Sequence, residues 1–149
     1  MKSDRSGDKC IFCIAAADSD DETNLVVYRA RRNFVILNRY PYTSGHIMIA
    51  PYEHVPRLMA ADEATTQEMM FLVRRSEQFI EEAYRPDGLN LGMNLGKAAG
   101  AGIEQHIHMH LLPRWRNDAN FMTTIAEARI VPETLDETYL KLREKFAQL

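Results

Sequence analysis

The stretch Gln105-His106-Ile107-His108-Met109-His110-Leu111-Leu112-Pro113 places three histidines at alternating positions. Because successive side chains of a β-strand point to opposite faces, this spacing predicts a strand with all three imidazoles on one face, about 6.5–7 Å apart. The apolar residues between them then face a core. A helix would scatter the rings around its axis. Pro113 has no amide hydrogen and is expected to end the strand.

The histidine cluster points to chemistry rather than packing, because the whole chain has only five histidines. A metal site would need two histidines at i and i+2 together with a third ligand, usually a carboxylate or another histidine. A phosphate-handling site would need a neutral imidazole as nucleophile and neighbouring N–H groups that bind the phosphate oxygens. The residues alone leave both kinds of site open.

The triad and its flanking segments together resemble the histidine triad family. Within that family they look like the branch of diadenosine tetraphosphate phosphorylases and related hydrolases. Matching features occur from Cys10 to Phe121, most of the chain. They are strongest in the segments His106–Leu112, Asn38–Pro51, Asn90–Gly96, Pro113–Trp115 and Asp118–Phe121.

This resemblance implies a reaction with a covalent intermediate. His108 attacks the α-phosphate of a nucleotide derivative, and water or inorganic phosphate then releases the nucleotide. His110 binds and polarises the phosphate oxygens and assists the leaving group, His46 lines the same pocket, and His106 completes the catalytic set. Imidazole suits this chemistry because it is a good nucleophile and, when protonated, a good leaving group. No catalytic cofactor is expected, since imidazoles and backbone amides can stabilise the phosphate charge.

Four further residues are candidate nucleotide contacts. The resemblance implies that Asn38 contacts the ribose hydroxyls; the alternative is a turn residue. Asn94 precedes the small-residue loop 96–102, and the glycines of this loop, among them Gly102, would let backbone N–H groups approach a phosphate. A flexible hairpin connection would have the same composition. Trp115 lies where the phosphorylase branch carries a site tryptophan, and it could stack on a base or be structural.

One departure from the family bears on the reaction. In the phosphorylases the residue four positions before the first triad histidine is a serine in a Gly-Ser pair, whereas this chain has Ala101-Gly102. The missing hydroxyl favours hydrolysis of dinucleoside polyphosphates or related nucleotidyl conjugates over phosphorolysis. The alternatives are a phosphorylase, a nucleotide-binding regulator with weak turnover, and a hydrolase with zinc held by the triad itself.

Cys10 and Cys13, the only cysteines, form a Cys-x-x-Cys pair. Such a pair can bind zinc or be redox-active. The resemblance supplies two further ligands, His54 and His106. Four ligands of this Cys₂His₂ type would form a closed tetrahedral site, so we expect a structural zinc that fastens the N-terminal segment to the sheet.

Length and charge set wider bounds. A chain of 149 residues is expected to form one histidine triad domain over residues 1–149, with residues 1–8 flexible. The net charge of −3 argues against a nucleic-acid partner. No apolar run has transmembrane length, no signal-type leader is visible, and the two cysteines do not indicate a secreted scaffold. A cytoplasmic protein without a membrane partner is therefore expected.

Apolar periodicity predicts the secondary structure. Strands are expected at residues 24–28, 34–38, 46–50 and 89–95, in addition to the triad strand. A long helix is expected from Asp62 to Tyr84 and a last helix opening at Pro132, with an exposed turn at residues 18–24. Strands mixed with two main helices predict an α+β fold with a largely antiparallel sheet. The resemblance implies five strands and a homodimer.

Overall fold

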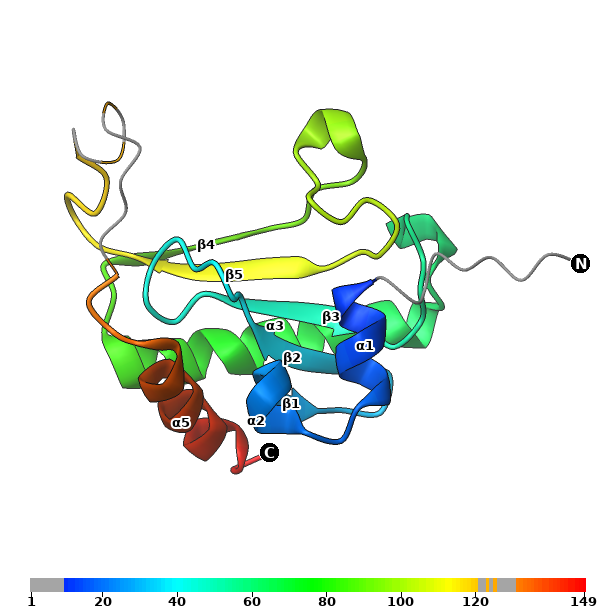
Figure 1. Ribbon diagram of the computed structural model, residues 1–149, viewed down its shortest axis with the longest axis horizontal. Helices are drawn as coiled ribbons and strands as arrows, with labels where there is room; N and C mark the ends of the chain where they lie inside the picture. Colours follow the sequence, from blue (N-terminus) through cyan, green and yellow to red (C-terminus); the bar gives the residue numbers. More distant parts are fainter. Residues whose placement is uncertain (1–9, 121–122, 124, 126–130) are drawn as a thin grey trace, which may run out of the picture.

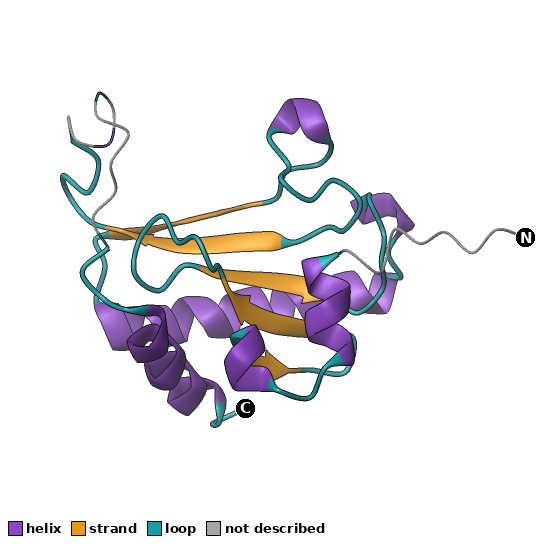
Figure 2. Ribbon diagram, in the orientation of Figure 1, coloured by secondary structure: helices purple, strands orange, loops and turns teal. Residues whose placement is uncertain are grey.

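The sheet has five strands, all paired antiparallel, in the order β1-β2-β3-β5-β4 (Figures 1 and 2). A computed structural model describes residues 10–120, 123, 125 and 131–149. The strands are β1 Val26–Arg29, β2 Asn33–Leu37, β3 Ile47–Pro51, β4 Gly88–Gly92 and β5 Met109–Arg114. This architecture confirms the predicted α+β fold with a five-stranded antiparallel sheet. The expectation that residues 1–8 are flexible lies outside the described residues.

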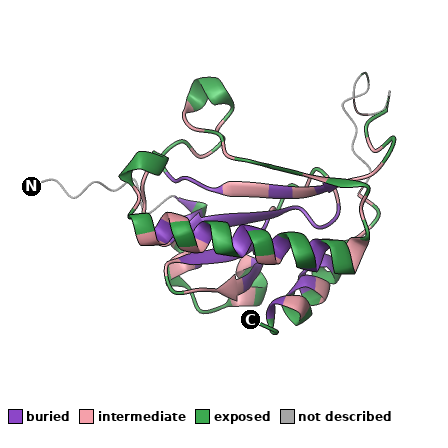
Figure 3. Ribbon diagram, turned by 180° about the vertical axis from the view of Figure 1, so that it is seen from behind, coloured by how far each residue is buried: buried purple, intermediate pink, exposed green. Residues whose placement is uncertain are grey.

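Two long helices pack beside the sheet. They are α3 Glu63–Tyr84 and α5 Leu135–Phe146, accompanied by the short helices α1 Ile11–Ala17 and α2 Asp21–Asn24 and by the 3-10 turns η2 Leu58–Ala60 and η3 Lys97–Ala99. Helix α3 covers one face of the sheet with its buried side, and α1 lies against the opposite face (Figures 1 and 3). The buried apolar residues of α3 are Met69, Leu72, Val73, Phe79 and Ile80.

The observed helices differ from the predicted ones at several boundaries, for local reasons. Helix α3 matches the prediction, with Asp62 at its N-cap. Helix α5 begins at Leu135, so the prediction that Pro132 opens it was wrong. The N-cap is Thr134, whose side chain accepts from the N–H of Glu137 while the Glu137 carboxylate accepts from the Thr134 N–H. The segment 18–24, expected to be a turn, contains helix α2.

The triad strand is shorter at its start and longer at its end than predicted. Strand β5 begins at Met109, so His106 and His108 precede it. The ladder stops there because Ile107 donates its N–H to the carbonyl of Val55 (2.9 Å), beyond the end of β3. One continuous strand carrying all three histidines was therefore a wrong prediction.

Pro113 does not end β5, which runs on to Arg114. The last residue of β5 paired with β3 is Leu111, whereas β4 continues alongside, with Leu89 opposite Pro113. The Pro113 carbonyl accepts from the Thr43 hydroxyl on the β3 side (2.9 Å), and within a strand the N and O of one residue point the same way. The missing amide hydrogen therefore faces away from β4 and costs no ladder bond. Strand β4 ends at Gly92, earlier than the predicted residue 95.

Candidate functional site

Three histidine rings gather where β3 and β5 run side by side. His108 and His110 lie with ring centroids 4.8 Å apart, and His46, which immediately precedes β3, lies 5.2 Å from His110. His46 and His108 are buried, and His110 is half-buried. The alternating spacing thus does bring neighbouring triad rings together, even though the first two precede the strand.

A glycine turn positions His46. Gly45 has φ of +80°, a conformation in which L side chains are strained, and a Cβ at this position would lie 2.9 Å from the ring of Tyr84. The turn therefore requires glycine, and it delivers the chain directly into β3 with the His46 side chain facing His110.

Hydrogen bonds define the proton positions in the His46–His110 pair. The backbone N–H of Tyr42 donates to Nδ1 of His46 (3.2 Å), so in the neutral ring the proton sits on Nε2. That Nε2–H donates to Nδ1 of His110 (2.9 Å), and neutral His110 then carries its own proton on Nε2. Asn38 adds an amide nitrogen 3.4 Å from the His46 ring nitrogens, while its Oδ1 accepts from the Tyr40 N–H (2.9 Å).

His108 has the opposite tautomer. Its Nδ1–H donates to the backbone carbonyl of His106 (2.9 Å), which leaves the lone pair on Nε2. Burial lowers the pKa of His108, so the ring is neutral near pH 7. A neutral imidazole with its tautomer held by a backbone carbonyl can act as a nucleophile.

Burial, followed by the electrostatic effect of neighbouring His108, also lowers the pKa of His110 to about 4. At neutral pH the ring is thus an uncharged N–H donor. Such a donor can bind a phosphate oxygen without adding positive charge to the empty site.

A second cluster joins Cys10, Cys13, His54 and His106, whose potential ligand atoms all lie within 4.8 Å of one another. The Cys10 sulfur is 3.4 Å from Nδ1 of His106, the Cys13 sulfur is 3.1 Å from Nδ1 of His54, and the two Nδ1 atoms are 3.2 Å apart. Neighbouring ligands of a tetrahedral zinc are about 3.3–3.8 Å apart, given its bond lengths. All four predicted ligands are therefore brought together, and the cluster can hold a metal ion.

The protonation states of the ligand side chains also suit a bound cation. Nε2–H of His106 donates to the Pro51 carbonyl (2.8 Å), which leaves Nδ1 with a lone pair facing the cluster. Burial raises the pKa of the Cys13 thiol to about 11 and lowers the pKa of His106 to about 4. A cation would reverse the burial penalty on the thiolate and accept both imidazole lone pairs.

The remaining candidate residues have other local surroundings. The Asn94 side chain donates to the Gly100 carbonyl of its own loop (3.4 Å), and Gly102 is exposed with nothing within 4 Å of where a Cβ would be. Trp115 follows the last residue of β5 and lies five residues after His110, a backbone span of about 16 Å at the rise of a strand. Its ring packs edge-on against Tyr84, with centroids 6.5 Å apart.

The sequence reasoning missed two residues that shape the site. Phe12 lies between the two cysteines, and its ring packs 5.1 Å from His106 and 4.8 Å from His108. Its place inside the Cys-x-x-Cys segment was a signal that could have found it. Tyr42 contributes through its backbone N–H, for which a sequence carries no signal.

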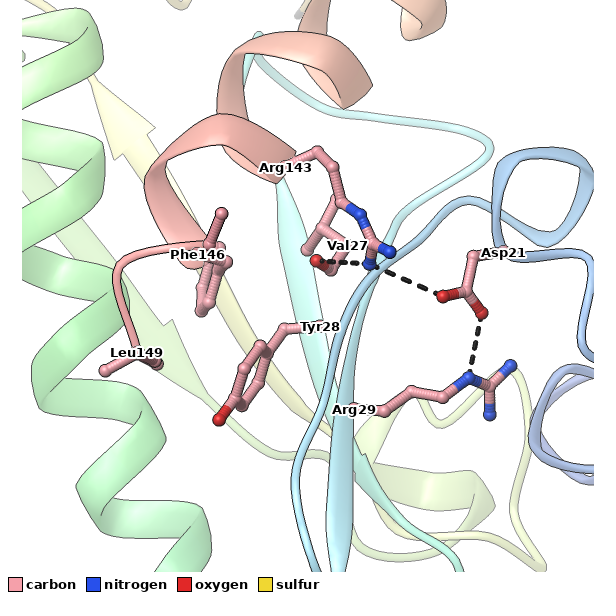
Figure 4. A pocket seen from close by; sticks show the side chains of 8 residues that line it. Asp21, Val27, Tyr28, Arg29, Arg143, Phe146 and Leu149 are labelled. Carbon is pink, nitrogen blue, oxygen red and sulfur yellow. Dashed lines mark hydrogen bonds and ion pairs between the residues drawn. The ribbon is translucent and has the colours of Figure 1, made fainter.

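Figure 4 shows a separate pocket at the other edge of the sheet, between β1, α2 and α5. Arg29 and Arg143 both pair with Asp21 there, at 2.8 and 3.4 Å, and Arg143 also donates to the Val27 carbonyl. Strands β2 and β3 separate this pocket from β5. Its charged groups fasten α5 and α2 to the sheet edge.

Among the helices of the described residues, none is both long enough and apolar enough to cross a membrane.

Comparison with known proteins places this geometry in a family. Residues 20–117 match the HIT domain. A curated relative from Mycobacterium tuberculosis, named AP-4-A phosphorylase, is 38% identical over 128 residues, which cover 86% of this chain and 66% of that protein. This chain thus spans slightly under two thirds of that relative's length. The bis(5'-nucleosyl)-tetraphosphatase (asymmetrical) of Schizosaccharomyces pombe is 30% identical over 62% of this chain and 50% of its own.

A solved structure agrees with the sequence matches. The Zn-bound histidine triad family protein from Mycobacterium smegmatis superposes with a TM-score of 0.75 at 27% identity, covering 96% of both chains. With the HIT domain matched over most of the chain and the three histidines in place, this protein belongs to the histidine triad family.

Proposed function

We propose that this protein is an enzyme, a nucleotidyl hydrolase or transferase that cleaves dinucleoside polyphosphates resembling diadenosine tetraphosphate, or related nucleotidyl conjugates. The observation that carries the proposal is the 2.9 Å hydrogen bond from Nδ1 of His108 to the His106 carbonyl. It keeps the nucleophilic lone pair on Nε2 of a buried, neutral ring. The relatives named for diadenosine tetraphosphate and bis-nucleosyl tetraphosphate chemistry support the substrate class.

In the first step, Nε2 of His108 attacks the α-phosphorus. An N–P bond forms, and the bond to the leaving polyphosphate breaks with its electron pair on the departing oxygen. The ring becomes a nucleotidyl imidazolium whose Nδ1–H still donates to the His106 carbonyl. That carbonyl partly offsets the new positive charge.

His110 and His46 act on the phosphate rather than on His108 in this proposal. The His46 Nε2–H holds the His110 ring through Nδ1, so His110 can donate its Nε2–H to a phosphate oxygen. A polyphosphate leaves as a stable anion and needs little protonation. Charge stabilisation, rather than proton transfer, is therefore the main demand on this pair.

In the second step the nucleotidyl group passes to water or inorganic phosphate, and the electron pair of the N–P bond returns to His108. Gly102 has no hydroxyl to hold phosphate, which supports hydrolysis, whereas the 38% identical relative named AP-4-A phosphorylase supports phosphorolysis. Hydrolysis is our leading assignment and phosphorolysis the second candidate. A nucleotide-binding regulator would show binding with only weak turnover.

The test is incubation with diadenosine tetraphosphate, with and without inorganic phosphate, followed by chromatography of the products. Hydrolysis predicts AMP and ATP at a rate independent of phosphate. Phosphorolysis predicts ADP and ATP only when phosphate is present. Binding without products in either condition would contradict both enzymatic assignments and favour the regulator.

We also propose that the Cys10, Cys13, His54 and His106 cluster holds a structural zinc. Four protein ligands close the coordination shell, so the ion would cross-link the chain and leave no open position for substrate. The Zn-bound relative from Mycobacterium smegmatis supports this assignment. Zinc on the triad itself has less support, because in the assigned tautomers Nε2 of His108 offers a lone pair, whereas Nδ1 of His110 is occupied by His46 and Nδ1 of His106 faces the Cys/His cluster; zinc needs at least three protein ligands.

For the proposed homodimer, β4 is the best-supported contact. It is an edge strand, and four of its five residues are exposed, including Leu91, whose exposed fraction is 55%. An open edge with an apolar side chain favours strand pairing with a second copy. Light scattering should give a dimer mass for the wild type and a monomer mass for Leu91→Lys; equal masses for the two proteins would overturn this contact.

Asn38, Asn94, Gly102 and Trp115 stay predictions as nucleotide contacts. Asn38 has the strongest support, because its amide lies 3.4 Å from the nitrogens of His46.

A further inference from the structure

Three atoms of His106 make polar contacts: Nδ1, Nε2 and the backbone carbonyl oxygen. Its Nδ1 faces the sulfur of Cys10 and Nδ1 of His54, at 3.4 and 3.2 Å. Its Nε2–H donates to the Pro51 carbonyl, and its own carbonyl accepts from Nδ1 of His108. The residue is fully buried, so none of these groups can exchange its partner for water at no cost.

Two further contacts join the Cys/His cluster to His108. The Ile107 N–H donates to the carbonyl of Val55, the residue after His54, and so ties the two histidine-bearing segments together. The Phe12 ring, held between the two cysteines, packs on the rings of both His106 and His108. A change in the cluster therefore reaches His108 from two sides, through the backbone at residues 106–107 and through Phe12.

Within the cluster, Nδ1 of His106 can accept a proton donor or bind a cation. With the His106 proton pinned on Nε2 by Pro51, Nδ1 of His106 presents a lone pair to Nδ1 of His54 only 3.2 Å away. Either Nδ1–H of His54 or the thiol of Cys10, 3.4 Å away, can donate to this lone pair. A bound metal removes this choice, because it accepts both lone pairs and both sulfurs at once.

We propose that the metal ion held by this cluster positions the nucleophile. It fixes His106 so that the His106 carbonyl holds His108 in the Nδ1–H tautomer, with Nε2 bare and aimed for attack. His106 is thus a positioning residue whose side chain serves the metal and whose backbone serves His108. The proposal rests on the function proposed for His108 above, but the tautomer itself can be measured without any substrate.

The test compares two substitutions of His54, the histidine ligand that lies outside the segment of residues 106–108. His54→Ala removes one ligand and leaves residues 106–108 unchanged. His54→Cys keeps four ligands and is the conservative rescue. Ala15→Gly is the matched control, because Ala15 is buried in α1 and its substitution weakens the packing of this helix without touching a ligand.

The first readout is the ¹⁵N NMR spectrum of histidine-labelled protein at pH 8. With stoichiometric zinc, the wild type, His54→Cys and Ala15→Gly should show His108 as a single Nδ1–H tautomer. His54→Ala and metal-stripped wild type should show a mixture of tautomers, and adding zinc or cadmium alone should restore the single tautomer only in the wild type.

The second readout is turnover of diadenosine tetraphosphate. We expect kcat of His54→Ala to fall by about 10- to 100-fold, as for other changes that loosen the support of a site, with KM within about twofold. His54→Cys should recover most of kcat. If folded, metal-free His54→Ala keeps both the wild-type tautomer and the wild-type kcat, the proposal is overturned.

The two readouts separate this inference from the proposed function. A metal-dependent tautomer with no turnover in any variant would support the positioning role and contradict the proposed reaction. If the His108 tautomer is the same with and without the metal, the positioning role is overturned, whatever the turnover.

Discussion

The His46–His110 pair and the His54–His106 pair both bring two imidazole nitrogens to about 3 Å, yet they do different things. Nε2 of His46 lies 2.9 Å from Nδ1 of His110, and the two Nδ1 atoms of the other pair are 3.2 Å apart. In the first pair the Tyr42 N–H leaves the proton between the rings, so they form a hydrogen bond. In the second the Pro51 carbonyl draws the His106 proton to the far nitrogen, so the near nitrogens can share a cation.

The comparison teaches that the second hydrogen-bond partner of an imidazole sets its role. A backbone donor, as at His46, leaves the ring with an N–H that donates to the next ring. A backbone acceptor, as at His106, leaves a lone pair that can bind a metal ion or attack phosphorus. His108 lies between the two pairs, and its own backbone acceptor, the His106 carbonyl, leaves Nε2 bare for attack.

The largest expected effect comes from removing the nucleophile and leaving both pairs intact. His108→Asn should lower kcat by roughly four to five decades, equivalent to about 5–7 kcal/mol in the barrier. Nucleotide binding should survive, because an amide can hold a phosphate but cannot form the intermediate. Rapid-quench kinetics and calorimetric titration measure the two quantities. Residual turnover within tenfold of the wild type would remove His108 from its role.

Breaking the metal pair should have the next largest effect, on stability. Cys13→Ala should release about one zinc per chain, and the loss of an ion held at 100 to 1,000 times its Kd costs about 3–4 kcal/mol. The melting temperature should fall by roughly 10 °C for a domain of this size. Scanning calorimetry and metal analysis test this. A chelator should lower the melting temperature of the wild type but not that of the variant; a metal-free wild type would contradict the assignment.

Breaking the other pair should spare the metal. His46→Ala removes the donor to His110 and should lower kcat by about 10- to 100-fold, the value of a hydrogen bond worth about 1.5–3 kcal/mol in the transition state. Zinc content should stay at the wild-type level. His46→Gln, which keeps an N–H donor, is the control and should retain more activity than His46→Ala. Loss of zinc in either variant would show that the two pairs are not independent.

The smallest expected effect is on the pH dependence of stability. Burial lowers the pKa of His110 from 6.5 to about 4. Above pH 6.5 the ring is neutral in both states, and its contribution is fully present. Between pH 6.5 and 4, His110 binds a proton in the unfolded chain but not in the folded protein. The free energy of unfolding therefore falls as the pH falls.

Urea denaturation from pH 4 to 8 measures this contribution as the difference between the wild type and His110→Asn. The variant should lose stability less steeply below pH 6.5, because it lacks the titrating ring. Parallel curves for the two proteins would show that the His110 pKa is the same in the folded and unfolded states.

Much of the fold followed from local patterns. The 3.6-residue periodicity and acidic cap predicted α3 almost to the residue, and the alternation of histidines predicted that His108 and His110 would meet. The Cys-x-x-Cys spacing predicted two residues of the Cys/His cluster, Cys10 and Cys13, and the family resemblance supplied the other two, His54 and His106. Each of these features depends on spacing along the chain, which a sequence displays directly.

What the sequence did not predict depends on backbone groups of distant segments. Strand β5 begins only at Met109 because the Ile107 N–H donates to the Val55 carbonyl. It continues through Pro113 because the polar backbone atoms of this residue face Thr43 and not β4. The His46 tautomer depends on the Tyr42 N–H in the same way. Backbone donors and acceptors are identical at nearly every position, so only the folded chain shows which ones meet.

The central claim is that the nucleotidyl group passes through His108, and its most direct test is to trap the intermediate. The protein is mixed with diadenosine tetraphosphate, quenched within milliseconds in alkali to preserve an N–P bond, and mapped by mass spectrometry. We predict one adenylyl group on the peptide that contains His108, with none in His108→Asn. Full turnover with no adduct at any time point, or an adduct on another residue, would contradict the account.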